Sequence, residues 1–253
     1  MKKIVIISDL HCGSIYGLTP PEWQSVSHKH DEQKFSWDEY MRIANKWYAP
    51  DILYIGGDCI DGKQTKSGGS ELITSDRNAQ CDMAVVAINK WHAKKILMTY
   101  GTAYHSGQEE DFEWQIAERL GAKIEGHLFF ECGGVTFDCR HKVGRSIVPY
   151  GRASAVLRDI MWNMLSYVTN DEPLANVIIR SHVHYHIWVE QPNRVAFTTP
   201  ALQLSGGRYG SRECVGETHW GAIRLTVDDG KIIGKDIDIC KIRSNKPKLY
   251  RVR

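Results

Sequence analysis

The sequence predicts an α/β or α+β fold, because short apolar runs alternate along it with longer amphipathic segments. Apolar runs at residues 3–8, 52–55, 95–100 and 177–180 are typical of strands whose two faces are both covered. With 253 residues, of which 42% are hydrophobic, the chain can bury one sizeable core. We therefore expect a single domain that spans residues 1–253.

The segments between these strands predict helices and one long loop. The capping box Ser36-x-x-Glu39 predicts a helix that runs to about Tyr48, and Pro50 follows its end. Further helices are expected at about 75–92, at 109–120 and at 153–168. Residues 12–35 show no periodicity, so we expect a long loop there that walls a cleft.

The remaining strands are predicted as hairpins. Residues 128–131 and 135–139 are separated by Gly133-Gly134, a sequence typical of a tight turn between antiparallel strands. Four more strands are expected at residues 187–190, 195–198, 222–227 and 232–239. Asp228-Asp229-Gly230 predicts the turn between the last two.

Six residues with metal-binding side chains follow the predicted strands. Each one alone is weak evidence, since a lone histidine after a strand is usually an ordinary hydrogen-bonded side chain. Together they form a set of carboxylates and imidazoles that suits a two-metal hydrolase. The set comprises Asp9, His11, Asp58, His141, His182 and His184.

The order Asp-x-His, Gly-Asp, a lone His and His-x-His resembles that of the calcineurin-like metallophosphoesterases. The resemblance runs from Asp9 to His184 and includes the C-terminal strands, and its form is similar to divergent members from phage and prophage genomes. It implies a four-layer αββα sandwich. It also implies an enzyme that hydrolyses a phosphomonoester or phosphodiester with a metal-bridging hydroxide at a dinuclear centre.

The resemblance also implies a distribution of the ligands over two divalent metal ions. Asp9, His11 and His184 would hold one ion, and His141 and His182 the other. Asp58 would bridge both, which is physically sensible because two close dications repel unless an anion lies between them. Mn²⁺ is the favoured activator, and Fe, Zn or Ni also suit this mixture of ligands.

One motif of the family is altered in this chain. Where the family has Gly-Asn-His, the sequence is Gly101-Thr102-Ala103-Tyr104-His105. The hydroxyl of Thr102 is a poor ligand for a dication. His105 is a candidate catalytic acid above the metals, which we favour, or a replacement ligand. Arg152 is a candidate phosphate-binding residue, since a guanidinium can grip two phosphate oxygens.

Composition says little about the substrate. The net charge is +2 and the pI is near 8.1, so the chain has no strong positive electrostatic field that would indicate binding to nucleic acid. The basic tail at 241–253 is interpreted as a solvated segment. The phage-like resemblance nevertheless favours nucleic acid or a nucleotide as the phosphoester substrate. An alternative function is a non-catalytic scaffold that retains the fold, because fold does not determine function.

The sequence favours the cytoplasm. Only a short apolar run follows Lys2-Lys3, too short for a signal peptide, and no stretch is long enough to span a membrane. Seven cysteines without a Cys-x-x-Cys pair fit neither a disulfide framework nor a zinc ribbon. We expect a reducing compartment and no membrane partner. The oligomeric state is left open.

Overall fold

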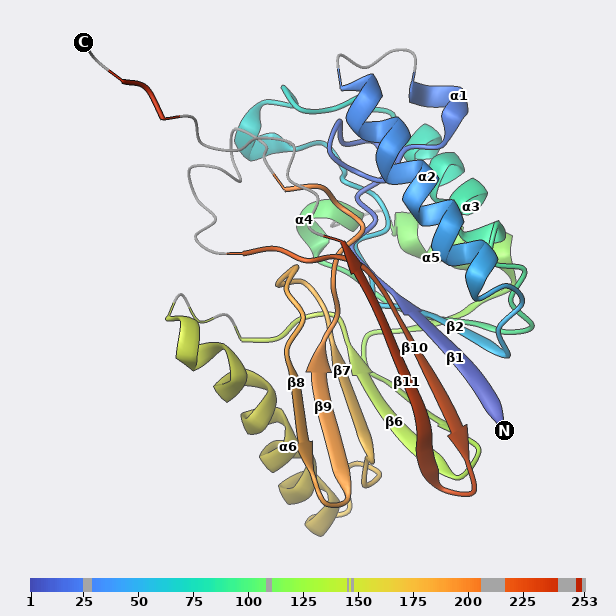
Figure 1. Cartoon of the computed structure of the whole chain (residues 1–253), viewed down its shortest axis with the longest axis vertical. Coiled ribbons are helices and arrows are strands. Elements are labelled where there is room, and N and C mark those ends of the chain that lie inside the picture. Colours follow the sequence, from blue (N-terminus) through green and yellow to red (C-terminus); the bar gives the residue numbers. More distant parts are fainter. Residues whose placement is uncertain are drawn as a thin grey trace.

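The chain forms two β-sheets that pack face to face, with helices on both outer faces (Figure 1). This computed structural model describes residues 1–24, 29–107, 111–144, 146, 148–205, 217–240 and 249–251. The strand order is β11-β10-β1-β2-β3-β4 in the first sheet and β5-β6-β7-β9-β8 in the second. The predicted four-layer αββα sandwich is therefore confirmed.

The strands lie close to their predicted positions. The first sheet contains β1 (Lys2–Ile7), β2 (Ile52–Ile55), β3 (Ile96–Thr99), β4 (Lys123–Glu125), β10 (Trp220–Asp228) and β11 (Lys231–Cys240). The second sheet contains β5 (Leu128–Cys132), β6 (Val135–Arg140), β7 (Val177–Arg180), β8 (Trp188–Gln191) and β9 (Arg194–Thr198). Strands β1 to β4 pair in parallel with one another, as do β6, β7 and β9, whereas the remaining pairings are antiparallel.

The helices cover the outer faces of the sheets unequally. The described helices are α1 (Pro21–Gln24), α2 (His30–Lys46), α3 (Arg77–Asn89), α4 (Ala103–Ser106), α5 (Phe112–Leu120) and α6 (Arg152–Val168). Two short 3₁₀ turns lie at Thr65–Ser67 and Pro149–Gly151. Helices α2, α3 and α5 pack on the first sheet, whereas α6 covers the second (Figure 1). No helix among the described residues is long and apolar enough to cross a membrane.

Strand β1 shows why the sandwich has its core on both sides of the first sheet. Alternate side chains of a strand point to opposite faces. Ile4 and Ile6 lie in the core between the sheets, while Val5 and Ile7 lie in the core beneath the helices. All four are fully buried. A strand that is buried on both faces must be apolar throughout, as this one is.

Helix α2 corrects the predicted loop at residues 12–35. The helix begins at His30, six residues before the expected start, and Ser36 is buried within it instead of capping it. Asp31 and Glu32 lie in its first turn, where acidic side chains favour the positive end of the helix dipole. Residues 12–20 are buried in extended and turn structure rather than exposed. Residues 25–28 of the expected loop lie outside the described residues.

Strand β4 is an element that the sequence analysis missed. It has three residues and pairs in parallel with β3 at the edge of the first sheet. Lys123 and Glu125 are exposed and only Ile124 is partly buried. One apolar residue between two charges carries no strand signal of its own.

Candidate metal centre

All six predicted ligands lie at one edge of the sandwich, where β1, β2, β6 and β7 end. Backbone hydrogen bonds connect the segments that follow β1 and β2: Asp9 N donates to Gly57 O and His11 N donates to Asp58 O. The two sheets meet here as well, because the amide of His182 lies 3.4 Å from Asp9 Oδ2. The parallel strands thus deliver the six side chains to two adjoining clusters.

The first cluster contains Asp9, His11 and His184, and their ligand atoms all lie within 4.8 Å of one another. Asp9 Oδ1 is 3.2 Å from His184 Nε2 and 4.0 Å from His11 Nε2. Burial alone would raise the pKa of Asp9, but the charge and proximity of His184 outweigh burial and lower the pKa to about 2. Asp9 is therefore an anion at neutral pH.

The second cluster contains Asp58, His141 and His182, again with ligand atoms within 4.8 Å of one another. Asp58 Oδ2 is 3.1 Å from His141 Nε2 and 3.9 Å from His182 Nδ1. Burial opposes charge on His141, yet the Asp58 carboxylate raises the pKa of that imidazole to about 10. The same pair of charges holds the pKa of Asp58 well below its usual range, against the effect of burial.

The hydrogen bonds of the rings turn acceptor atoms toward each cluster. His11 Nδ1 donates to Asp61 Oδ1 at 2.8 Å, and His141 Nδ1 donates to Gly56 O at 2.5 Å. Both rings therefore direct Nε2 into the site. Asp9 Oδ1 is buried and has no hydrogen-bond partner, although two imidazoles face it. A buried anion that lacks a donor costs free energy unless a cation satisfies it.

This donor set fits divalent transition metals. Each cluster offers one carboxylate and two imidazoles, and an outer hydrogen-bond acceptor orients one ring of each cluster. Such acceptors are the usual means by which a protein fixes the tautomer and direction of a ligating histidine. The structure thus brings the predicted ligands together in an arrangement suited to metal. Their assignment to particular ions, with Asp58 bridging, stays a prediction.

The backbone at these residues is unusual. Five of the six predicted ligands have positive φ angles, and all five are in the left-handed region that non-glycine residues rarely adopt. These angles are 52° at Asp9, 47° at His11, 50° at Asp58, 73° at His182 and 54° at His184. Left-handed residues with side chains cluster at functional sites, where the surrounding structure holds them in place.

Asp61 is a site residue that the sequence analysis missed. Its carboxylate is buried, accepts a hydrogen bond from His11, and lies 3.4 Å from His105 Nδ1. Gln64 Nε2 donates to its other oxygen. His11, Asp61 and His105 form a third group whose ligand atoms lie within 4.8 Å of one another. No local signal marked it, because Asp61 follows Asp58 by three residues but its partner His11 lies 50 positions earlier.

The altered segment after β3 supports Asp58 rather than replacing it. Thr102 donates to Asp58 Oδ1 from its backbone amide at 2.6 Å and from Oγ1 at 3.1 Å. Glu113 of α5 accepts hydrogen bonds from the amides of Cys59 and Gly101, at 2.9 and 2.5 Å. Burial, and then the negative charge of Asp58, raise the pKa of Glu113 to about 7. This buried carboxyl group joins the segments that follow β2 and β3.

The structure places His105 beside the first cluster. Its Nδ1 donates to the backbone oxygen of Asp61 at 2.9 Å, which leaves Nε2 available. Its ring meets the ring of His11 edge to face, with centroids 4.6 Å apart. The side chain is 18% exposed, so it lies at the border between the buried ligands and solvent. Whether it acts as an acid or a ligand stays a prediction.

Arg152 is the first residue of α6. Its guanidinium carbon is 4.5 Å from the centre of the Tyr185 ring, and Tyr185 directly follows the predicted ligand His184. The Arg152 Nε atom is buried and has no hydrogen-bond partner. Arg152 thus contacts the sequence neighbour of a predicted ligand, and its contact with phosphate stays a prediction.

Comparisons with known proteins give a likeness of fold. No family model matches the sequence, and no curated protein matches it. Several solved structures match nearly the whole chain. Among them are zinc-bound Vps29 from Entamoeba histolytica (10% identity, 94% of this chain and 98% of that chain, TM-score 0.48), an archaeal phosphodiesterase (13%, 94% and 99%, 0.47) and the phosphoesterase YfcE from E. coli (13%, 92% and 98%, 0.44).

Identities of 13% or lower with these scores concern chain architecture alone. They establish neither activity nor substrate for this chain. A function for this chain can be inferred only from the residues of its site. The likeness to phage and prophage members stays a prediction.

Proposed function

We propose that this protein is a metal-dependent phosphoesterase. The observation that carries the proposal is the pair of adjoining clusters, in which two buried carboxylates and four imidazoles converge from four strand ends. A set of solvated surface residues would have no reason to be buried or to adopt left-handed backbone angles. Sites of this composition with two ions are typical of enzymes that hydrolyse phosphoesters.

Two divalent ions, with Mn²⁺ favoured and Fe, Zn or Ni also suited, would supply an activated water and would neutralise charge on the phosphoryl oxygens. The protein's part is to hold the six ligands at fixed separations. Asp61 and Gly56 orient two of the rings through their hydrogen bonds. Thr102 and Glu113 keep Asp58 and its segment in place.

His105 is proposed as the group that gives a proton to the leaving oxygen. Its Nδ1 is held by the backbone oxygen of Asp61, so the ring has a fixed direction and Nε2 is free to carry a proton. Arg152 is proposed to bind a non-bridging phosphate oxygen, because a guanidinium can donate two parallel hydrogen bonds to a phosphate group. His105 contacts the predicted ligand His11, whereas Arg152 contacts Tyr185, the residue that follows the predicted ligand His184.

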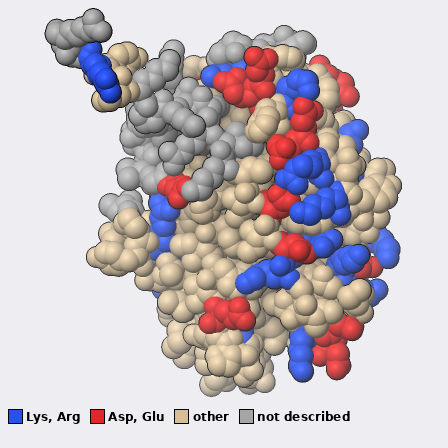
Figure 2. Space-filling view, in the orientation of Figure 1, with Lys and Arg blue, Asp and Glu red and all other residues tan. Residues whose placement is uncertain are grey.

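The substrate is proposed to be a phosphomonoester or phosphodiester in a nucleic acid or nucleotide. Figure 2 shows Lys and Arg side chains interspersed with Asp and Glu on one face of the molecule. Some of these charged side chains form ion pairs with one another, since Arg42 and Lys46 both contact Asp238 at 2.7–2.9 Å. A face of mixed charge does not favour a long polyanion, so we favour a small or single-stranded substrate over a duplex.

The decisive experiment combines metal analysis with two chromogenic substrates. Purified protein loaded with Mn²⁺ should bind two ions per chain and cleave p-nitrophenyl phosphate or bis-(p-nitrophenyl) phosphate. The ratio of the two rates separates monoesterase from diesterase. The double variant Asp58→Asn/His182→Ala should lose both metal and activity.

A matched control is the double variant Asp236→Asn/His92→Ala. It makes the same chemical changes on the surface, away from the site, and should retain both properties. Metal binding without cleavage of either ester would favour the non-catalytic scaffold. Equal metal content in the site variant and the wild type would refute the proposed centre.

A further inference from the structure

Helix α6 is apolar on the face that points away from the protein. Its inner face packs on the second sheet through Ala155, Val156 and Ile160, which are buried against residues such as Ile178 of β7. The outer side carries large apolar residues that are 38–76% exposed, namely Leu157, Met161, Trp162, Met164, Leu165 and Val168. The outer side of a helix that covers a sheet is normally polar, so this surface requires an explanation.

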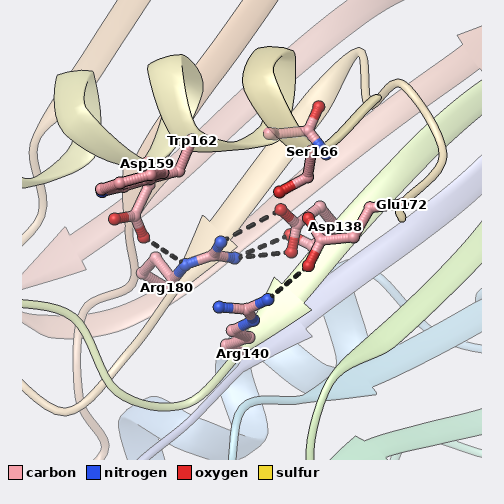
Figure 3. Close-up of a pocket in the computed structure, with 8 residues that line it drawn as sticks. Asp138, Arg140, Asp159, Trp162, Ser166, Glu172 and Arg180 are labelled. Carbon is pink, nitrogen blue, oxygen red and sulfur yellow. Dashed lines mark hydrogen bonds and ion pairs between the residues drawn. The ribbon is translucent and has the colours of Figure 1, made fainter. Parts of the chain in front are cut away.

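The helix cannot rotate to bury these residues, because its inner face is tied to the sheet. Asp159 accepts a hydrogen bond from Arg180 Nε of β7 at 2.6 Å, and Arg180 is buried and also bound to Asp138 of β6 (Figure 3). Asn163 donates to Pro173 O and accepts from Ala175 N, both at 2.9 Å. These contacts fix which side of α6 faces solvent.

The exposed apolar residues have the spacing of a helix–helix seam. Leu157, Met161, Met164 and Val168 follow one another at intervals of four, three and four residues. This is the a/d pattern of a coiled coil, in which the apolar stripe of one helix packs into the stripe of a second helix. This spacing places the four side chains on one stripe of α6, a shape into which a second helix fits.

We propose that the partner is α6 of a second copy of this chain, packed antiparallel about a two-fold axis. In antiparallel pairs each a position faces a d position of the other helix. With the axis between residues 162 and 163, Leu157 faces Val168 of the second copy and Met161 faces Met164. All four positions match at once, so the stripe is complementary to itself, as a closed two-fold interface requires.

The size and charge of the surface agree with this partner. The six side chains are 38–76% exposed on each copy, so two copies together with their flanking residues offer a surface on the order of the 1,200–2,000 Å² that specific interfaces bury. Among the exposed residues from Leu157 to Val168, Arg158 is the only charged one. A helix that lies on an anionic membrane normally carries several Lys or Arg residues beside its apolar face. An exposed face of α6 with a single charged residue favours a second copy of this chain as the partner.

The test is the mass of the full chain by light scattering after size exclusion. The wild-type protein should have twice the chain mass of 28.8 kDa at micromolar concentration. Met161→Glu and Met164→Lys should each be monomeric, because a charge would be buried without a partner. Mixing the two variants should restore a dimer, since residues 161 and 164 face each other only in the antiparallel register.

Ile233→Glu is the control, because Ile233 is 55% exposed on β11 and far from α6 in sequence. It should leave the dimer intact, and thermal unfolding should show that all variants are folded. A monomeric wild-type protein would overturn the proposal, whether or not it binds lipid vesicles. Dimers that persist in both α6 variants would overturn it too, as would a failure of the mixed variants to associate.

Discussion

Replacing Asp61 by Asn should weaken metal binding without unfolding the protein. Asp61 Oδ1 accepts the Nδ1 proton of His11 at 2.8 Å, and the two side chains are 2% and 3% exposed. The hydrogen bond thus joins a buried anion to an imidazole that is a predicted ligand. Asn keeps an acceptor oxygen in nearly the same place but removes the charge, and its amide nitrogen meets the donor Nε2 of Gln64.

The expected loss follows from the strength of this interaction. A hydrogen bond to a charged group contributes about 1.5–3 kcal/mol, and an outer carboxylate on a ligating histidine typically changes metal affinity by about 10- to 100-fold. A tenfold change in a dissociation constant corresponds to about 1.4 kcal/mol, so the range of hydrogen-bond energies agrees with the range of affinity losses. We expect the first ion to be held about 10- to 100-fold more weakly in Asp61→Asn.

Competition with a chromogenic chelator measures this affinity directly. Asp236→Asn is the matched control, because Asp236 is half-exposed and pairs with Arg224 on the outer strands. The control should bind Mn²⁺ like the wild type. If Asp61→Asn is folded and its affinity lies within twofold of the control, the proposed orientation of His11 by Asp61 is wrong.

Three further predictions concern catalysis, acid stability and packing at the site. His105→Ala should lower turnover by about 10² to 10⁴ while both metals stay bound, with the larger loss on esters that have poor leaving groups. The pKa of Asp138 is lowered to about 2, because the hydrogen bonds and charges of His127 and Arg180 outweigh the effect of burial. Relative to the usual aspartate pKa of 3.8, this contributes about 2 kcal/mol at neutral pH. That stability should be lost as the pH falls from about 4 to 2 in urea titrations of the wild type. Asp138→Asn should cost about 1.5–3 kcal/mol already at pH 7, because the buried Arg180 keeps Asp159 but loses its charged partner on β6. Gly57→Ala should reduce bound metal in elemental analysis, because a Cβ there would lie 2.7 Å from the backbone of the segment after β3 and φ is +84°.

The sequence predicted what depends on short-range periodicity. Strands such as β1 and β7 are apolar throughout because both of their faces are covered, so their positions and their order were readable. Since parallel strands end at a common edge, the ligands that follow them could be expected to converge. Helix α5 was also predicted, and it ends at Gly121, which has the left-handed conformation typical of a helix C-terminus.

The sequence could not predict what depends on contacts between distant segments. Asp61 reaches His11 across 50 positions, and Glu113 reaches Cys59 across 54. Neither carboxylate differs locally from a surface acid. The start of α2 was misjudged for a related reason, since Ser36 fits a capping pattern but is buried against the core. Tertiary burial, and not the local motif, decides where that helix begins.

The backbone at the ligands links the fold to the proposed chemistry. A side chain in the left-handed region costs on the order of 1–3 kcal/mol, and it persists only where the surroundings determine it. Here the segment after β1 is held by hydrogen bonds from Asp9 N, His11 N and Cys12 N to the segment after β2, which extends the pairing of the two strands beyond their ends. Glycine would relieve the strain, but glycine has no ligand atom. The proposed metal centre accounts for Asp and His at these positions, because a dication requires side chains that point inward at fixed separations, whereas packing alone does not.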